Sequence, residues 1–142
     1  MLDKPEISDN KIVIPSDPAL ISVVDEFLES NLRRHGIADE IVADIAICAS
    51  EIVNNGIHHG NRQDPTKVVS MELKFTETEV TVIVADQGKF FDPDSIADPV
   101  AAENLLREVG RGVFIVRQLM DRVEITEAES GGTVVSFTKK FA

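Results

Sequence analysis

Residues 68–86 have the sequence VVSMELKFTETEVTVIVAD, and this stretch decides the kind of fold. Apolar side chains occupy every second position in VVSMELKF (68–75) and in EVTVIVAD (79–86), with the polar TETE between them. Such alternation is typical of strands with one buried face, and the short polar connection predicts an antiparallel hairpin. The same pattern predicts further strands at residues 6–14, 122–128 and 132–141.

Apolar residues recur at helical spacing in three segments around this hairpin. Helices are predicted from a cap at Ser16 or Asp17 to about Arg34, from residue 39 to residue 60, and from residue 110 onward. This order predicts an α+β fold, a two-layer α/β sandwich whose mostly antiparallel mixed sheet is covered on one face by helices. A length of 142 residues fits a single domain over 1–142.

Composition restricts the function classes. The formal charge of −11 repels a nucleic-acid backbone, so we expect no direct nucleic-acid binding. No apolar run approaches the ~20 residues that span a bilayer, and no export signal is recognisable at the start, so we expect no membrane association. The single cysteine, Cys48, forms no internal disulfide, which favours a cytoplasmic location. A phosphate-bearing ligand remains compatible with this charge where a metal ion and backbone N–H groups offset it.

The segment SEIVNNGIHHG (50–60) places polar residues at the edge of an apolar helix face. Glu51 and Asn55 are one helical turn apart, and His59, one turn later, either stays on this face or lies just past the frayed end of the helix. They can form an ordinary hydrogen-bond network near a helix end. Alternatively, Glu51 is an acid that accepts a proton, beside an amide oxygen of Asn55 suited to Mg²⁺.

Three glycine-containing segments add weaker signals. Asp86 and Gly88 directly follow a predicted buried strand, which indicates either a polar turn or an acceptor for an adenine amine. Gly110 and Gly112 flank a predicted helix start, which is either simple punctuation or an anion site. The turn before Thr133 is explained by its glycines alone, or places a hydroxyl on a ligand.

These four elements, in this order, resemble the nucleotide site of the GHKL (histidine kinase-like) ATPase superfamily. The stretches SEIVNNGIHHG, ADQGKFFDPDSIADP, ENLLREVGRGVFIVRQLMD and GGTVVSF are similar to those of anti-sigma factor serine/threonine-protein kinases. The resemblance spans nearly the whole chain and implies the Bergerat, or histidine kinase-like, ATPase fold.

The resemblance also implies ATP and Mg²⁺ as cofactors, with a lid at about residues 89–109 that closes over the nucleotide. By this resemblance, Glu51 is the catalytic base and Asn55 holds the metal. The residues implied to bind the nucleotide are Asn55, His59, Asp86, Gly88, Gly110, Arg111, Gly112, Val113 and Thr133. Lys89 and Phe90 depart from the family pattern D-x-G-x-G, which lacks its second glycine here.

The implied function is an ATP-dependent protein-serine/threonine kinase that acts as an anti-sigma factor. Its implied partners are an anti-anti-sigma (STAS-domain) protein as substrate and a sigma factor or similar regulator, and the resemblance leaves a homodimer open. The alternative is a non-catalytic ATP-binding switch that sequesters a regulatory partner. The presence of Glu51 favours the kinase, because a carboxylate there has little purpose in a pure switch.

Overall fold

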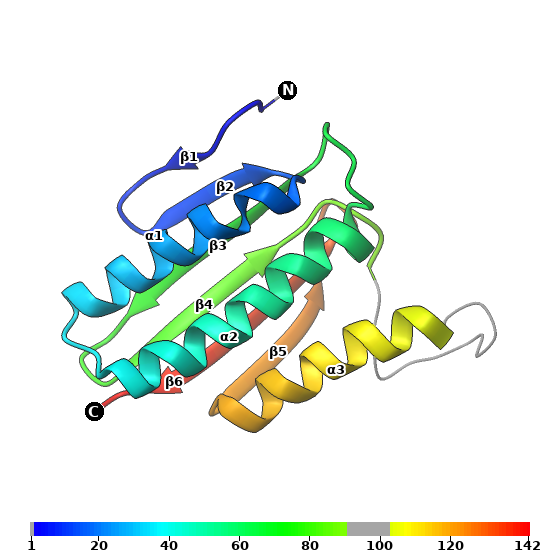
Figure 1. Ribbon diagram of the computed structural model, residues 1–142. Helices are drawn as coiled ribbons and strands as arrows, with labels where there is room; N and C mark the ends of the chain where they lie inside the picture. Colours follow the sequence, from blue (N-terminus) through cyan, green and yellow to red (C-terminus); the bar gives the residue numbers. More distant parts are fainter. Residues whose placement is uncertain (1, 91–102) are drawn as a thin grey trace.

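The computed structural model describes residues 2–90 and 103–142, and for residues 103–108 it describes the backbone alone (Figure 1). Within this part of the chain the α-helices are α1 (Ile21–Arg34), α2 (Asp39–Asn55) and α3 (Glu103–Leu119). The strands are β1 (Glu6–Ile7), β2 (Lys11–Pro15), β3 (Val68–Phe75), β4 (Glu79–Ala85), β5 (Arg122–Glu127) and β6 (Thr133–Lys140). A 3-10 turn, Pro18–Leu20, precedes α1, and a π-helical turn, Gly56–Gly60, extends α2.

The described strands form one sheet in the order β1-β2-β3-β4-β6-β5. Every pairing among them is antiparallel. The predicted predominance of antiparallel pairing is confirmed, whereas the prediction that the sheet is mixed is wrong for these strands. The predicted hairpin is confirmed, with Met71 of β3 opposite Val84 of β4. The last strand, β6, lies between β4 and β5, so that Phe137 faces Val82 on one side and Val123 on the other.

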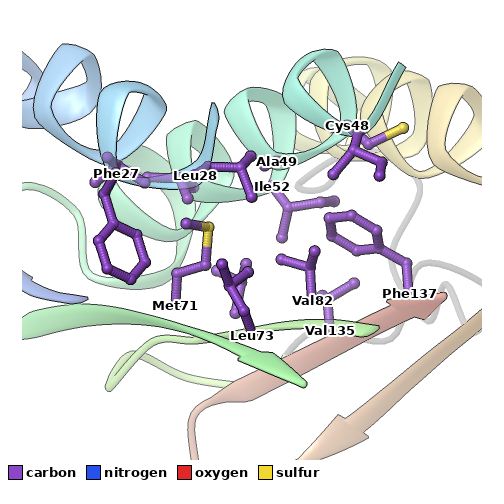
Figure 2. Close-up of a cluster of buried hydrophobic side chains, with 14 of the residues drawn as sticks. Phe27, Leu28, Cys48, Ala49, Ile52, Met71, Leu73, Val82, Val135 and Phe137 are labelled. Atoms are coloured by element: carbon purple, nitrogen blue, oxygen red, sulfur yellow. The ribbon is translucent and has the colours of Figure 1, made fainter. Parts of the chain in front are cut away.

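The helices α1, α2 and α3 cover one face of this sheet (Figure 1), which confirms the predicted two-layer sandwich. Figure 2 shows the core between the layers, where Leu28 of α1 and Ile52 of α2 meet Leu73 and Phe137 of the sheet. Leu28 and Phe137 are completely buried. Burial of a side chain of this size contributes about 1.5–3 kcal/mol, and this core anchors α2, which carries much of the candidate site.

One predicted helix start agrees with the structure and another does not. The predicted cap is confirmed, because the Asp17 carboxylate accepts a hydrogen bond of 3.0 Å from the Ala19 N–H in the turn before α1. The predicted start of the third helix at Gly110 is wrong, since α3 begins at Glu103. The segment ENLLREV consists mostly of good helix formers, and a glycine inside a helix lowers its stability by about 1 kcal/mol without ending it.

The remaining boundaries are close to those predicted. The expected first strand is divided by a turn into β1 and β2, and the last two strands end within one residue of their predicted limits. The predicted lid, about 89–109, lies largely outside the described residues, which resume at 103. None of the described helices is both long enough and apolar enough to cross a bilayer.

Candidate functional site

A cavity of about 650 Å³ lies beside the end of α2, the π-helical turn, the end of β4 and α3. Binding sites for small molecules are typically ~300–1,000 Å³, so this cavity has a suitable size for a nucleotide. Its lining combines apolar side chains with a few polar and charged groups. The lining residues are Ile52, Asn55, Gly56, His59, Gly60, Asn61, Arg62, Asp64, Lys67, Val84, Asp86, Lys89, Phe90, Val109, Val113, Ile125, Thr133 and Val135.

Asp86 is a hydrogen-bond acceptor in the wall of this cavity. It follows β4 directly, and its Oδ1 accepts hydrogen bonds from the N–H groups of Gly88 (3.0 Å) and Thr133 (3.1 Å). Its Oδ2 accepts no hydrogen bond from the described residues. Burial raises the pKa of Asp86 above its ordinary value, although the two N–H groups and the nearby Lys67 partly oppose this effect. One oxygen is therefore fixed by the backbone, and the other is left to accept from a ligand.

Two glycines allow the chain to pass close to this carboxylate. A Cβ added to Gly60 would overlap Oδ2 of Asp86, and a Cβ added to Gly88 would overlap the backbone carbonyl of Gly60. The close approach predicted for Gly88 is thus to the protein's own backbone. Gly60 was not among the predicted site residues, because its contact with Asp86 joins positions far apart in sequence and leaves no local signal.

Glu51 and Asn55 lie one turn apart on α2, as the helical spacing predicted, and the structure places both beside Gly112 of α3. A Cβ added to Gly112 would lie 3.0 Å from Nδ2 of Asn55 and 3.3 Å from Oε2 of Glu51. Asn55 and His59 line the cavity, whereas Glu51 lies outside its lining. The structure therefore brings the acid, the amide and the second glycine of the predicted pair into one cluster at the cavity's edge.

The predicted helix N-terminus at Gly110 and Gly112 is not present. Both glycines and Arg111 lie inside α3, seven or more residues from its start. N–H groups beyond the first turn of an α-helix bond to carbonyls of the preceding turn. The N–H groups at Gly110 and Gly112 are therefore not those of a helix start, and the predicted anion site at a helix N-terminus is wrong for this arrangement. Val113 lines the cavity, and Arg111 is exposed. A role of this segment in nucleotide binding stays a prediction.

The cavity also contains cationic side chains that the sequence did not predict as site residues. Arg62, Lys67 and Lys89 all contribute to the cavity lining, in a chain of strongly negative net charge. Isolated basic residues in loops carry no periodic signal, so only the fold reveals that they converge. These three cations outnumber the two carboxylates of the lining, Asp64 and Asp86, which favours an anionic ligand because positive charge offsets the desolvation of phosphate groups.

The residues present fit ATP with Mg²⁺. Asp86 supplies a hydrogen-bond acceptor for an amine, the cations suit phosphates, and the Asn55 amide supplies an oxygen of the type that Mg²⁺ prefers. Within the described part of the chain, no cluster of three His, Cys, Asp or Glu side chains is placed to hold a metal. Mg²⁺ commonly retains several waters and binds through substrate phosphates, so one protein oxygen is compatible with it.

The described residues thus form a two-layer α+β sandwich with a cavity of about 650 Å³ at the end of α2. Residues 14–139 match the family model described as the histidine kinase-like ATPase domain, and the chain belongs to that family. The resemblance inferred from the four sequence elements is therefore confirmed.

Individual relatives agree with this family. The chain is 25% identical over 135 residues to a protein of Oceanobacillus iheyensis named serine-protein kinase RsbW, with 91% of this chain and 84% of that relative covered. It is 26% identical over 133 residues to a protein of the same name from Staphylococcus aureus strain Newman, with 89% and 82% covered.

A solved structure supports the fold. The crystal structure of the RsbU and RsbW domains of a Mycobacterium tuberculosis protein superimposes with a TM-score of 0.63 at 22% identity, and the match covers 91% of this chain. The chain spans about a third of that solved chain, 32% of its length. At this identity the similarity concerns the fold alone.

Proposed function

We propose that this chain is an ATP-dependent protein-serine kinase that acts as an anti-sigma factor and phosphorylates an anti-anti-sigma partner. The observation that carries the proposal is the cluster of Glu51 and Asn55 against Gly112, at the edge of a cavity that contains the acceptor Asp86. The two relatives named serine-protein kinase RsbW support it, because they match this chain over most of their length.

In this proposal Asp86 selects the base. Its Oδ2 accepts a hydrogen bond from the exocyclic amine of adenine, while Gly88 and Thr133 hold Oδ1 in place. Arg62, Lys67 and Lys89 attract the phosphates by charge. Asn55 would be the protein ligand of Mg²⁺, which when bound neutralises negative charge on the phosphates during transfer.

Glu51 acts as the base in this proposal. Its Oε2 takes the proton from a serine hydroxyl of the partner protein, which makes that oxygen a better nucleophile. The packing against Gly112 holds the Glu51 side chain on the side of α2 that faces α3. A side chain held by its neighbours in this way loses less conformational freedom when it reacts.

The partners follow from the family resemblance and the names of the relatives. We propose a STAS-domain anti-anti-sigma protein as substrate, a sigma factor or similar regulator as the sequestered protein, and the cytoplasm as the location. We also propose that residues 1–142 form one domain, with a lid at about 89–109 that excludes water when nucleotide is bound.

The test uses the purified chain, ATP with Mg²⁺, and STAS-domain proteins from the same organism. Intact-mass spectrometry of the partner should detect the mass of one phosphoryl group, located on a serine by fragmentation. A parallel thermal-shift measurement should show stabilisation of about 2.7 kcal/mol when the nucleotide is present at a hundred times its Kd. A stabilised protein that leaves every partner mass unchanged contradicts catalysis, and an unstabilised protein contradicts nucleotide binding.

One observation favours a second candidate, the non-catalytic ATP-binding switch. Glu51 lies outside the lining of the cavity in which the nucleotide would bind. A switch would grip its regulatory partner in an ATP-dependent manner without altering the partner's mass. Capture of the regulator only in the presence of ATP, with no phosphorylated species, would identify this function.

A further inference from the structure

Asn61, the residue after the π-helical turn, is a buried amide with every strong hydrogen-bonding position of its side chain used. It is 1% exposed. Its Nδ2 donates to Oγ of Ser16 at 2.8 Å and to the carbonyl of Val68 at 2.9 Å, and its Oδ1 accepts from the Gln87 N–H at 2.8 Å. The side chain therefore joins the end of β2, the start of β3 and the turn that follows β4.

This combination of bonds specifies an asparagine. Aspartate would accept from the Gln87 N–H but would place a carboxylate oxygen against the Val68 carbonyl, which offers no proton. An apolar side chain would leave the Gln87 N–H without this partner at a partly buried position, which weakens the hold on the turn. Glutamine has the right amide, but its extra methylene displaces the amide from three partners at once.

The turn that Asn61 holds is the one that carries the candidate acceptor. Gln87 lies between Asp86 and Gly88, and its own side chain accepts from the Val68 N–H at 2.8 Å. Asn61 thus holds the backbone N–H of Gln87, and Val68 holds the Gln87 side chain. Gly60, next to Asn61, lies so close to the Asp86 carboxylate that it accommodates no side chain. The position of Asp86 Oδ2 depends on these contacts across the cavity wall.

We propose that Asn61 is a positioning residue for base selection, which holds the backbone at Gln87 and so directs the Asp86 carboxylate toward the base. The inference rests on the proposed function, in which Asp86 accepts a hydrogen bond from the adenine amine. Asn61 also lines the cavity, but its amide N–H groups and its oxygen already bond to protein partners, so it acts through Gln87 and Asp86. Its removal should therefore affect discrimination between bases more than the affinity for phosphates.

The test compares ADP with IDP, whose base has a carbonyl oxygen where adenine has its amine. Calorimetry on the full chain should show a preference for ADP, that is, a larger Kd for IDP than for ADP. Asn61→Ala should reduce the ratio of the IDP Kd to the ADP Kd by about tenfold. Loss of affinity for both nucleotides in equal proportion, with an unchanged ratio, would assign Asn61 a purely structural role and overturn the inference. Ser16→Ala, which removes one acceptor of the Asn61 amide, should change the ratio in the same direction by a smaller factor.

Hydrogen exchange provides a readout that needs no nucleotide. In Asn61→Ala, or in Ser16→Ala if the first variant does not fold, the Gln87 amide should exchange faster than in the wild type, by more than the amides of the central strand β4. Equal acceleration throughout the sheet would contradict a local role. A wild type that binds ADP and IDP equally, or neither, would instead contradict the proposed use of Asp86, so the two failures are distinguishable.

Discussion

Gly112 of α3 lies directly against the side chain of Asn55 on α2. A Cβ at this position would be 3.0 Å from Nδ2 of Asn55 and 3.3 Å from Oε2 of Glu51, closer than side chains ordinarily pack. On the same helix, an equivalent Cβ at Gly110 would have none of the described residues within 4 Å. Two glycines of one helix thus differ in a single physical respect, namely the space beside them.

This difference predicts opposite results for two matched substitutions. Gly110→Ala should raise the free energy of unfolding by about 1 kcal/mol, because alanine is the better residue in a helix interior. Gly112→Ala gains the same propensity but crowds Asn55 and Glu51, so its net change should be near zero or destabilising. Thermal denaturation should separate the variants by about 3 °C or more. Equal melting temperatures would contradict the observed contact.

Asp86→Asn should increase stability at neutral pH and weaken nucleotide binding. The pKa of Asp86 is raised above its ordinary value of 3.8, chiefly by burial, so ionisation opposes folding. The wild type should lose stability as pH rises from about 3.8 through the raised pKa, whereas asparagine remains neutral throughout. Melting temperatures measured between pH 3.5 and pH 7 should therefore favour the variant increasingly as pH rises.

The same variant tests the role of Asp86 in base selection. Asparagine can retain the bonds from Gly88 and Thr133 through its oxygen, but it presents an N–H₂ group where Oδ2 was. Because two donors then face each other, we expect the affinity for adenine nucleotides to fall by about 10–100-fold. Titration calorimetry with ADP measures this change, and unchanged affinity would exclude Asp86 as the acceptor.

Glu51→Gln should abolish phosphoryl transfer while nucleotide binding persists. Glutamine has nearly the same shape but cannot take a proton from a serine hydroxyl, and loss of a general base typically lowers the rate by about 10²–10⁴-fold. Phosphorylation of the partner is followed by mass spectrometry. Glu40→Gln, at an exposed position in the first turn of the same helix, is the matched control and should keep full activity.

Cys48 should resist thiol reagents in the native protein. It lies on α2 in the core cluster of Figure 2 and is completely buried, and burial raises the pKa of its thiol to about 12. Almost no reactive thiolate exists at pH 8 under these conditions. A chromogenic disulfide reagent should react only as the chain unfolds, at a rate that follows unfolding in urea. Immediate labelling of the native protein would show that the core opens locally at α2.

The elements with strong periodicity were predictable from the sequence. The alternation in residues 68–86 is carried by Val69, Met71, Leu73, Val80, Val82 and Val84, each of which is buried in the structure. The pairing partners of the resulting hairpin are local, so pattern alone was sufficient. The start of α3 was not predictable in this way, because glycines at 110 and 112 suggested a boundary where helix-forming residues on both sides continue the helix.

The candidate site was predictable only where its residues are neighbours on one element. Glu51 and Asn55 are one turn apart on α2 and both lie beside Gly112, and helical spacing predicted that these two side chains are neighbours. The approach of Gly60 to Asp86 and the bonds of Asn61 to Ser16 and Gln87 join residues that are distant in the chain. Such contacts depend on how β2, β3 and β4 are ordered in the sheet, which local patterns do not encode.

The insertion of β6 between β4 and β5 has a consequence for synthesis on the ribosome. Among the described strands, β5 has β6 as its sheet neighbour, so residues 122–127 are translated before the strand that connects them to the sheet. The nascent chain therefore carries an open edge at β4 until residues 133–140 emerge. Non-local pairing of this kind slows folding and leaves strand edges available to other chains, so the interval before residues 133–140 emerge is one in which this protein is prone to misassembly.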